Sequence, residues 1–385
     1  MTEKARTPKR GDRASRRGGK APLPAHNDDA LLHDGERPVV ITGGAGFIGS
    51  NLAERLLAQG YQVVILDNLS RRGVVENLQW LQATHGERLH VEQADVRDRA
   101  AVRRAVAGAH VVFHFAAQVA VTSSLTDPRF DFDVNVGGTL NVLEAVRAQP
   151  SPPPVVYTST NKVYGSLPDV SLIEYDGRYE PLDLVLRGRG VGETRPLDFH
   201  SPYGCSQGAA DQYVLDYARS FGLATVVFRM SCVYGEHQFG TEDQGWVAHF
   251  LLRALAGLPI TLYGDGKQVR DVLFASDLVE ALLAAWAHAD QLRGKAFNIG
   301  GGPQNTTSLL ELVDLITALH GTRPALEHGG WRTGDQRYYA SDIRAFKAAT
   351  GWSPQVGVQA GVTRLYRWLA ENRRATATAM KRVAP

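Results

Sequence analysis

Residues 38–50 read PVVITGGAGFIGS, an apolar run followed by a glycine-rich turn and the opening of a helix. The continuous β-branched run at 39–41 is typical of a parallel strand that is covered on both faces. The turn places three glycines at spacings of three: Gly43, Gly46 and Gly49. Such a turn lets a pyrophosphate lie against the backbone at a helix N-terminus, where N–H groups and the helix dipole favour negative charge. The stretch therefore predicts a dinucleotide-binding strand, turn and helix.

The residues after the turn extend this prediction. An amphipathic stretch at 51–59 predicts a helix, and 61–66 predicts the next strand, with Asp67 behind it. A carboxylate at the end of that strand is placed to accept hydrogen bonds from an adenosine ribose, which favours NAD over NADP. Arg71 and Arg72 follow closely, and basic residues there could instead receive the 2′-phosphate of NADP.

The chain has 385 residues, which is room for one large α/β domain and a smaller partner. Its net charge of +2 is unevenly spread, because the first 20 residues carry eight Lys or Arg against two acidic residues. Residues 1–36 hold few large apolar side chains and predict a disordered basic tail. The rest of the chain is acidic overall, which gives no argument for a nucleic-acid partner.

Cysteine and histidine usage narrows the class further. The two cysteines, Cys205 and Cys232, exclude a disulfide framework and fit a reducing cytoplasm. No apolar run reaches the roughly 18 residues of a membrane span, and the first residues lack the apolar core of a signal peptide. The 12 histidines are scattered without metal-ligand spacing. We therefore expect a cytoplasmic protein with no membrane partner and no metal site.

Strands and helices are expected to alternate from residue 37 to about 235. The predicted strands are 89–93, 111–115, 155–157 and 224–228, and the predicted helices are 77–84, 99–107, 134–147 and 201–219. This alternation predicts an α/β fold with a doubly wound parallel sheet (Rossmann), whose ligands lie at the carboxyl ends of the strands. Residues 166–200 are polar and show no clear periodicity, so we assign them to a long substrate-side insertion.

Beyond residue 235 the alternation lapses, which predicts a smaller C-terminal α/β substrate-binding subdomain over 236–385. Within it, 272–300 is expected to return to the nucleotide-binding domain, with a helix at 277–287 and a strand at 296–299. Ser308 and Glu311 have the spacing of a capping box that opens a helix to residue 320.

The motifs together resemble a known family, the extended short-chain dehydrogenase/reductases that act on nucleotide sugars. The resemblance runs from about residue 37 to 372. It rests on TGGAGFIG at 42–49, on Asp67, Asp95, Val96 and Asn135, on the segment 114–118, and on the helix that carries Tyr203. Within this family the closest resemblance is to the CDP-tyvelose epimerases, also called CDP-paratose 2-epimerases. It rests on DNLSRRG at 67–73, TSTNKVYG at 158–165, the string at 196–223, and QFGTEDQGW at 238–246.

The resemblance implies three catalytic positions. Tyr203 matches the general base and Thr160 the hydroxyl that hydrogen-bonds the reacting sugar oxygen, while Gln207 stands where the family has a lysine. An amide can bind ribose hydroxyls but offers no full charge to a phenolate. Three explanations stay open: a deliberate Lys→Gln change made to trap a complex, a natural variant that uses another cation, or a member that has lost turnover. The other cation could be the nicotinamide ring or Lys162.

The resemblance also implies the binding residues and partners. The cofactor is expected to be NAD, held by Gly43, Gly46, Phe47, Ile48, Gly49, Asp67, Asn68, Ser70, Arg71, Asp95, Val96, Ala116, Ala117, Gln118, Asn135, Ser159, Tyr203 and Gln207. The substrate is expected to be a nucleotide-diphosphate sugar, bound by Thr122, Ser123, Thr160, Asn161, Gln238, Arg270 and Arg332, with His237 beside the nucleoside. A homodimer that pairs the helices at 134–147 and 206–219 is implied as well.

The reaction that the resemblance implies is epimerisation by hydride transfer to NAD and back, through a transient keto-sugar. Dehydratases of this family carry an Asp-Glu pair after the active threonine. This chain has Asn161 and Lys162 there, which disfavours dehydration because no acid is present to expel a hydroxyl group. Two alternatives stay open: a 4-epimerase that acts on a UDP-, GDP- or dTDP-sugar, and an NAD-binding protein without turnover.

Overall fold

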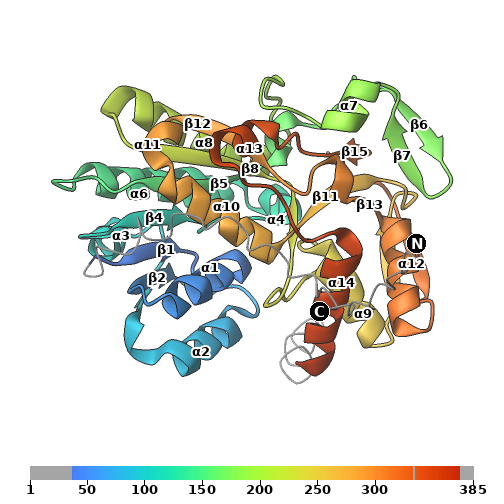
Figure 1. The fold of residues 1–385 in the computed structure, drawn as a ribbon, viewed down its shortest axis with the longest axis horizontal. Helices are drawn as coiled ribbons and strands as arrows, with labels where there is room; N and C mark the ends of the chain where they lie inside the picture. Colours follow the sequence, from blue (N-terminus) through green and yellow to red (C-terminus); the bar gives the residue numbers. More distant parts are fainter. Residues whose placement is uncertain (1–36, 333, 373–385) are drawn as a thin grey trace, which may run out of the picture. The chain divides into compact units, whose positions relative to one another are not determined.

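The computed structural model describes residues 37–332 and 334–372, so the predicted basic tail at 1–36 and the residues after 372 lie outside the described part (Figure 1). A seven-stranded parallel sheet in the order β12-β8-β5-β4-β1-β2-β3 forms its centre. Its strands are β1 (Val39–Thr42), β2 (Val63–Asp67), β3 (Leu89–Gln93), β4 (Val111–His114), β5 (Val155–Thr160), β8 (Thr225–Met230) and β12 (Lys295–Ile299). This sheet confirms the predicted α/β class with a doubly wound parallel sheet.

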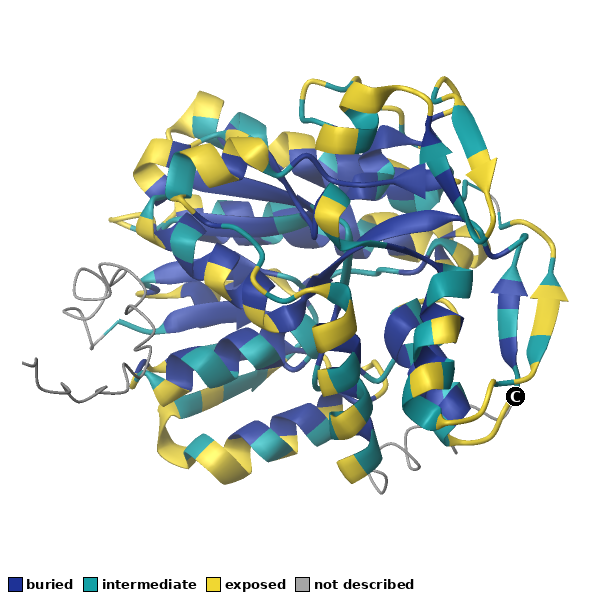
Figure 2. Ribbon diagram, turned by 45° about the vertical axis from the view of Figure 1, so that its right-hand side comes forward, coloured by how far each residue is buried: buried dark blue, intermediate teal, exposed yellow. Residues whose placement is uncertain are grey.

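Helices cover both faces of the sheet. One face packs on α3 (Arg99–Val106), α6 (Gly138–Arg147) and α8 (Ser201–Phe221), whose apolar residues form one core cluster with Val40, Val112 and Val227. The other face carries α1 (Phe47–Ala58), α2 (Val74–His85), α10 (Ala275–Ala287), α11 (Ala289–Leu292) and α13 (Arg344–Thr350). There Trp286 of α10 meets Phe113, and Phe346 of α13 meets Phe228. Figure 2 shows the resulting pattern of buried strands beneath helices that are exposed on their outer sides.

The structure differs from the expected helix boundaries at two places near the site. The expected helix at 134–147 begins with a π-helical turn, η3 (Asp133–Gly137), and continues as α6. Before it come two short helices, α4 (Val121–Thr126) and α5 (Pro128–Phe132). The first helix also begins earlier than expected, at Phe47 rather than at residue 51, directly after the glycine turn.

A second group of elements forms the C-terminal subdomain. Its strands are β9 (Cys232–Tyr234), β10 (Ile260–Tyr263), β11 (Val269–Phe274), β13 (Thr306–Ser308), β14 (Leu326–Gly329) and β15 (Tyr338–Tyr339). Its helices α9 (Trp246–Leu255), α12 (Leu309–His320) and α14 (Val358–Glu371) share one apolar cluster. The expected capping box is present, because Ser308 and Glu311 each bond the other's backbone N–H at the start of α12. The chain returns to the main sheet through α10 and β12, which pairs with β8.

Residues 166–200 contain regular structure that the sequence analysis did not predict. They form a hairpin of β6 (Leu172–Tyr175) and β7 (Arg178–Pro181) and then α7 (Leu184–Arg189). Arg178 pairs with Glu311 at 2.9 Å, so the hairpin packs against the C-terminal subdomain. Asp176 and Gly177 form the hairpin turn, with Gly177 at φ 85°, and this Asp-Gly pair between LIEY and RYEP was the signal that could have predicted it.

The remaining short turns are η2 (Gly86–Arg88), η4 (Asn161–Tyr164) and η5 (Pro303–Asn305). Within the part of the chain that the structure describes, none of the helices combines the length and the apolar character needed to cross a membrane.

Candidate active site

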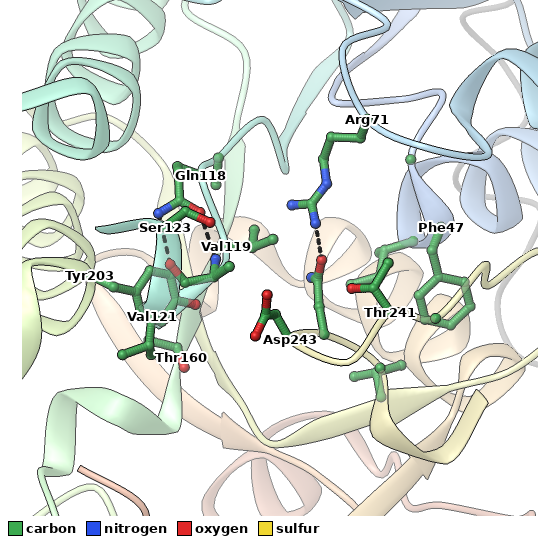
Figure 3. A pocket seen from close by; sticks show the side chains of 18 of the residues that line it. Phe47, Arg71, Gln118, Val119, Val121, Ser123, Thr160, Tyr203, Thr241 and Asp243 are labelled. Carbon is green, nitrogen blue, oxygen red and sulfur yellow. Dashed lines mark hydrogen bonds between the residues drawn. The ribbon is translucent and has the colours of Figure 1, made fainter. Parts of the chain in front are cut away.

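A cavity of about 1130 Å³ opens at the carboxyl edge of the sheet, between the sheet and the C-terminal subdomain. It is lined by every site residue expected from the sequence except Asn135. In Figure 3, Tyr203, Thr160 and Ser123 gather at one end, Phe47 and Arg71 lie toward the other, and Asp243 reaches in between them. The residues that line this cavity include none of the 166–200 segment.

Gly43 and Gly49, in the glycine turn at one end of the cavity, have no room for a side chain. Gly43 has φ 68°, and a Cβ there would lie 2.8 Å from the backbone nitrogen of Ala116. A Cβ on Gly49 would lie 2.5 Å from the carbonyl oxygen of Gly43. Helix α1 begins directly after this turn, with no side-chain cap on its first N–H groups. The turn thus presents backbone N–H groups at close range, which fits a pyrophosphate.

Acidic groups line the neighbouring strand ends. Asp67 accepts hydrogen bonds from the backbone nitrogens of Ala45 at 3.1 Å and Leu69 at 2.9 Å, and burial raises the pKa of its carboxyl group. Asp95 bonds Asn68 at 2.9 Å, and the hydrogen bond from Arg97 lowers the pKa of Asp95 to about 2. The strand end therefore holds carboxylate oxygens where a ribose and an adenine would present donors.

Tyr203 lies in the first turn of α8. Its backbone nitrogen donates to the Oγ of Ser124 at 3.1 Å, which fixes the start of the helix. Burial raises the pKa of the Tyr203 phenol to about 12, while a hydrogen bond with Thr160 and the charge of Arg71 act in the opposite direction. The phenol therefore stays protonated at neutral pH unless a ligand brings positive charge.

Gln207 lies one helical turn further along α8 and is 2% exposed. Its side-chain oxygen accepts a hydrogen bond from the phenol of Tyr157 at 2.8 Å. This bond fixes the orientation of the amide, because the NH₂ group must then point away from Tyr157. The ammonium group of Lys162, the other cation considered from the sequence, lies 3.4 Å from the carbonyl oxygen of Gly334.

Asn135 lies behind the cavity wall, against the expectation that it contacts the cofactor. Its side chain bonds both the backbone nitrogen of Gln118, at 2.8 Å, and the backbone oxygen of Gln118, at 3.1 Å. It also donates to Ser206 at 2.9 Å, and Ser206 in turn donates to the buried carboxylate of Asp131. Because these contacts join the loop after β4 to α8, Asn135 positions the wall of the site instead of lining it.

The other wall of the cavity carries two arginines, each of which lies beside an acidic side chain. Arg270, 7% exposed, bonds Asp335 at 2.5 Å. Arg332 lies 3.7 Å from a carboxylate oxygen of Glu242 and 3.7 Å from one of Asp243. These two acids belong to the turn Thr241–Gln244, whose last residue accepts a hydrogen bond from Arg71. The sequence marked this turn as part of a motif but did not predict that it crosses the cavity.

Other lining residues were also missed. Gln268 is 2% exposed, its side-chain nitrogen bonds the carbonyl oxygen of Tyr263, and its side-chain oxygen has no partner among the described residues. Its place in GDGKQVRD, two residues before Arg270, was the available signal. His237, expected beside the nucleoside, lines the cavity, stacks on Trp80 at 3.7 Å and approaches Trp368 at 4.9 Å.

Comparisons with known proteins agree with this geometry. Residues 39–300 match the model of the NAD dependent epimerase/dehydratase family. The chain is 46% identical over 338 residues to a CDP-paratose 2-epimerase of Salmonella typhi, covering 86% of this chain and 98% of that protein. It is 31% identical over 337 residues to a putative UDP-glucose 4-epimerase of Methanocaldococcus jannaschii, covering 87% of this chain and 99% of that protein.

A solved structure shows the same fold. The UDP-glucose 4-epimerase of Thermus thermophilus, in complex with NAD, superposes with a TM-score of 0.72 at 33% identity, covering 87% of this chain and 99% of that one. The predicted resemblance to this family is confirmed.

Proposed function

The chain belongs to the NAD dependent epimerase/dehydratase family and is an NAD-dependent nucleotide-sugar epimerase, and from that premise we propose that it inverts carbon 2 of a CDP-sugar. The main support for this proposal is that Tyr203, Thr160 and the glycine turn at 43–49 line one cavity. The 46% identity to a CDP-paratose 2-epimerase supports the choice of carbon and base over the alternatives.

The residues present fit NAD. A Cβ would fill the cradle at Gly43 and Gly49, and the carboxylate of Asp67 lies at the end of the second strand. Ser159 adds a buried hydroxyl with no partner among the described residues, in the wall of the same cavity. When bound, NAD supplies a hydride acceptor and a positive charge near the phenol.

Tyr203 is the proposed general base, which removes the proton from the reacting hydroxyl group. Thr160 holds the same oxygen through a hydrogen bond, so the alcohol is gripped from two sides. Gln207, held by Tyr157, directs its NH₂ group toward the place of a ribose. Arg270 and Arg332 bind the diphosphate, because guanidinium groups form paired hydrogen bonds with phosphate oxygens. The walls of the cavity limit the access of water to the transient ketone until its reduction on the other face.

The two positions that follow Thr160 hold no acid that could serve in dehydration. Asn161 and Lys162 follow Thr160, and Asn161 is engaged with Gln336 at 3.4 Å. A 4-epimerase acting on a UDP-, GDP- or dTDP-sugar is the second candidate, supported by the relative from Methanocaldococcus jannaschii. A protein that binds NAD without turnover is the third, supported by Gln207 in place of lysine.

The proposal is tested with a panel of CDP-, UDP-, GDP- and dTDP-sugars followed by NMR in D₂O. We expect one CDP-sugar to equilibrate with its carbon-2 epimer without uptake of deuterium at that carbon, because the same hydride returns. Tyr203→Phe should retain NAD binding and lose about 10²-fold or more of the rate. Inversion at carbon 4 would replace the proposal with the second candidate. Absence of turnover in both the present chain and Gln207→Lys would favour the third.

We also propose that the protein is a cytoplasmic homodimer. Two unpaired cysteines support a reducing compartment. Exposed aromatic side chains on α8, Tyr213 at 45% and Phe221 at 49%, support a paired helix face. Analytical ultracentrifugation of the chain and of Tyr213→Glu tests the dimer. Equal sedimentation of both proteins as monomers would contradict it.

A further inference from the structure

Lys162 is a cation to which the proposed mechanism assigns no role. It lies two residues after Thr160, in the turn η4, and its side chain lines the cavity. Its backbone nitrogen donates to the Oγ of Thr160 at 3.2 Å, so the positions of the two residues are coupled.

The ammonium group of Lys162 is incompletely bonded by the described residues. It lies 3.4 Å from the carbonyl oxygen of Gly334 and 3.9 Å from a carboxylate oxygen of Asp335. An ammonium group has three donors, and both of these contacts are long. Burial lowers the pKa of this ammonium group, and the charge of Arg270 acts in the same direction. The group therefore gains most from an anionic or hydroxyl oxygen that enters the cavity.

The position of Lys162 in the cavity indicates which ligand oxygen its ammonium group would bind. The carboxylate oxygen of Asp335 that approaches Lys162 also bonds Arg270, at 2.5 Å. Lys162 thus lies between Thr160, which grips the reacting alcohol, and Arg270, which grips the diphosphate. A sugar that spans these two residues must pass its first ring atoms beside Lys162. In a sugar, carbon 2 is adjacent to the carbon that bears the diphosphate, whereas carbon 4 lies across the ring.

We propose that Lys162 is a specificity-determining residue, which donates hydrogen bonds to the phosphate nearest the sugar and to the oxygen on carbon 2. This bridge holds the reacting carbon close to the diphosphate, and so presents carbon 2 rather than carbon 4 to the cofactor and to Tyr203. The inference rests on the proposed function, since it takes Thr160 and Arg270 in the roles given there.

Binding measured by calorimetry on the NAD-loaded protein tests the inference separately from turnover. The ligands are a CDP-hexose, the matched CDP-2-deoxyhexose and CMP, which lacks the second phosphate and the sugar. We expect the protein to bind the hexose about 10-fold or more tightly than its 2-deoxy analogue, because a hydrogen bond to a charged group is lost. Lys162→Met should reduce this preference to less than about 3-fold and leave CMP binding unchanged.

Two variants keep the comparison interpretable. Lys347→Met, on the exposed side of α13, removes a lysine far from the cavity and should behave as the parent protein. Lys162→Gln keeps a donor without the charge, and replaces Lys162→Met if that variant loses its cooperative thermal unfolding.

An equal loss of affinity for both hexoses, or no loss, overturns the inference. A parent protein that shows the 2-hydroxyl preference but inverts carbon 4 would refute the proposed function and the selection of carbon 2 by Lys162, and would leave only the contact between Lys162 and the carbon-2 oxygen.

Discussion

The phenol of Tyr157 donates a hydrogen bond to the side-chain oxygen of Gln207 at 2.8 Å, in the buried layer between β5 and α8. The amide is thereby held in one orientation one turn below Tyr203, but it brings no charge. Tyr203, the proposed base, and Gln207 therefore lie one turn apart on α8, and the side chain at 207 contributes no charge.

The first prediction concerns this missing charge. Gln207→Lys should lower the apparent pKa of Tyr203, which burial raises to about 12 in the present chain, because a cation within a few ångströms favours the phenolate by about 1 to 3 pKa units. The base acts in its deprotonated form, so the rising limb of kcat/KM should move to lower pH by that amount. The pH profile of kcat/KM measures the shift. Gln207→Met is the control, and an equal acid shift in that variant would contradict the electrostatic explanation.

The second prediction concerns the glycine turn. Gly49→Ala should abolish tight NAD binding, because its Cβ would lie 2.5 Å from both the oxygen of Gly43 and the Cα of Gly44, and backbone atoms cannot yield cheaply. Fluorescence titration with NADH measures the affinity, and we expect a loss of about 100-fold or more, equivalent to at least about 2.7 kcal/mol. Gly188→Ala in α7, where a Cβ meets no atom within 4 Å, is the matched control. Normal NADH binding by Gly49→Ala would show that the turn can relax.

The third prediction concerns the turn Thr241–Gln244. Its acids lie beside Arg332, so a diphosphate must compete with them for the guanidinium group. Asp243→Asn should therefore tighten CDP binding by about two- to fivefold at low ionic strength, in line with a partly exposed ion pair. The gain should shrink in high salt because solvent ions screen the pair. Calorimetry at two salt concentrations measures it. Glu280→Gln, which removes the exposed partner of Arg55, should have no effect on CDP binding.

The fourth prediction concerns stability. Arg229 and Asp211 form a paired hydrogen bond at 2.8 and 2.9 Å, and they are 5% and 0% exposed. Arg229→Met should lower the free energy of unfolding by about 3–5 kcal/mol, because it leaves the carboxylate of Asp211 buried without its partner. The double variant with Asp211→Leu should recover much of this loss. Urea unfolding measures both, and Arg219→Met in an exposed pair on the same helix should cost under about 0.5 kcal/mol. An equal cost for the single and double variants would contradict this account.

The main sheet could be predicted from the sequence because its signals are local. A continuous apolar run or an amphipathic pattern shows directly which residues of a strand or helix are buried. Gly43 and Gly49 in the turn at 43–49 are required because the backbone leaves no room for a Cβ there. Two strands of the C-terminal subdomain, β11 and β15, could not be predicted in this way. β15 has two residues and pairs with β11 across more than sixty positions, and β11 is buried throughout although it contains Arg270 and Asp271. Charged residues in a buried strand remove the pattern that periodicity detects.

In the candidate site, too, the features that depend on local sequence could be predicted, and those that depend on contacts between distant residues could not. Motif matching found the residues that line the cavity, since a motif records residue types at fixed spacing. It could not find that Asn135 lies behind the wall or that Tyr157 holds Gln207, because both depend on how side chains from distant strands and helices meet. The crossing of the cavity by Thr241–Gln244 depends likewise on Arg71 and Arg332, which lie 261 positions apart in the sequence.

The place of β12 in the sheet affects how the chain can be made. β8 is completed at Met230, but its outer edge remains without a neighbour until residues 295–299 have been synthesised. During that interval the nascent protein offers an unpaired edge strand, and such an edge readily recruits other chains. A translational pause or a truncation between residues 230 and 295 should therefore produce aggregates rather than a free nucleotide-binding fragment. The two domains are thus not expected to be separable by a truncation in this interval.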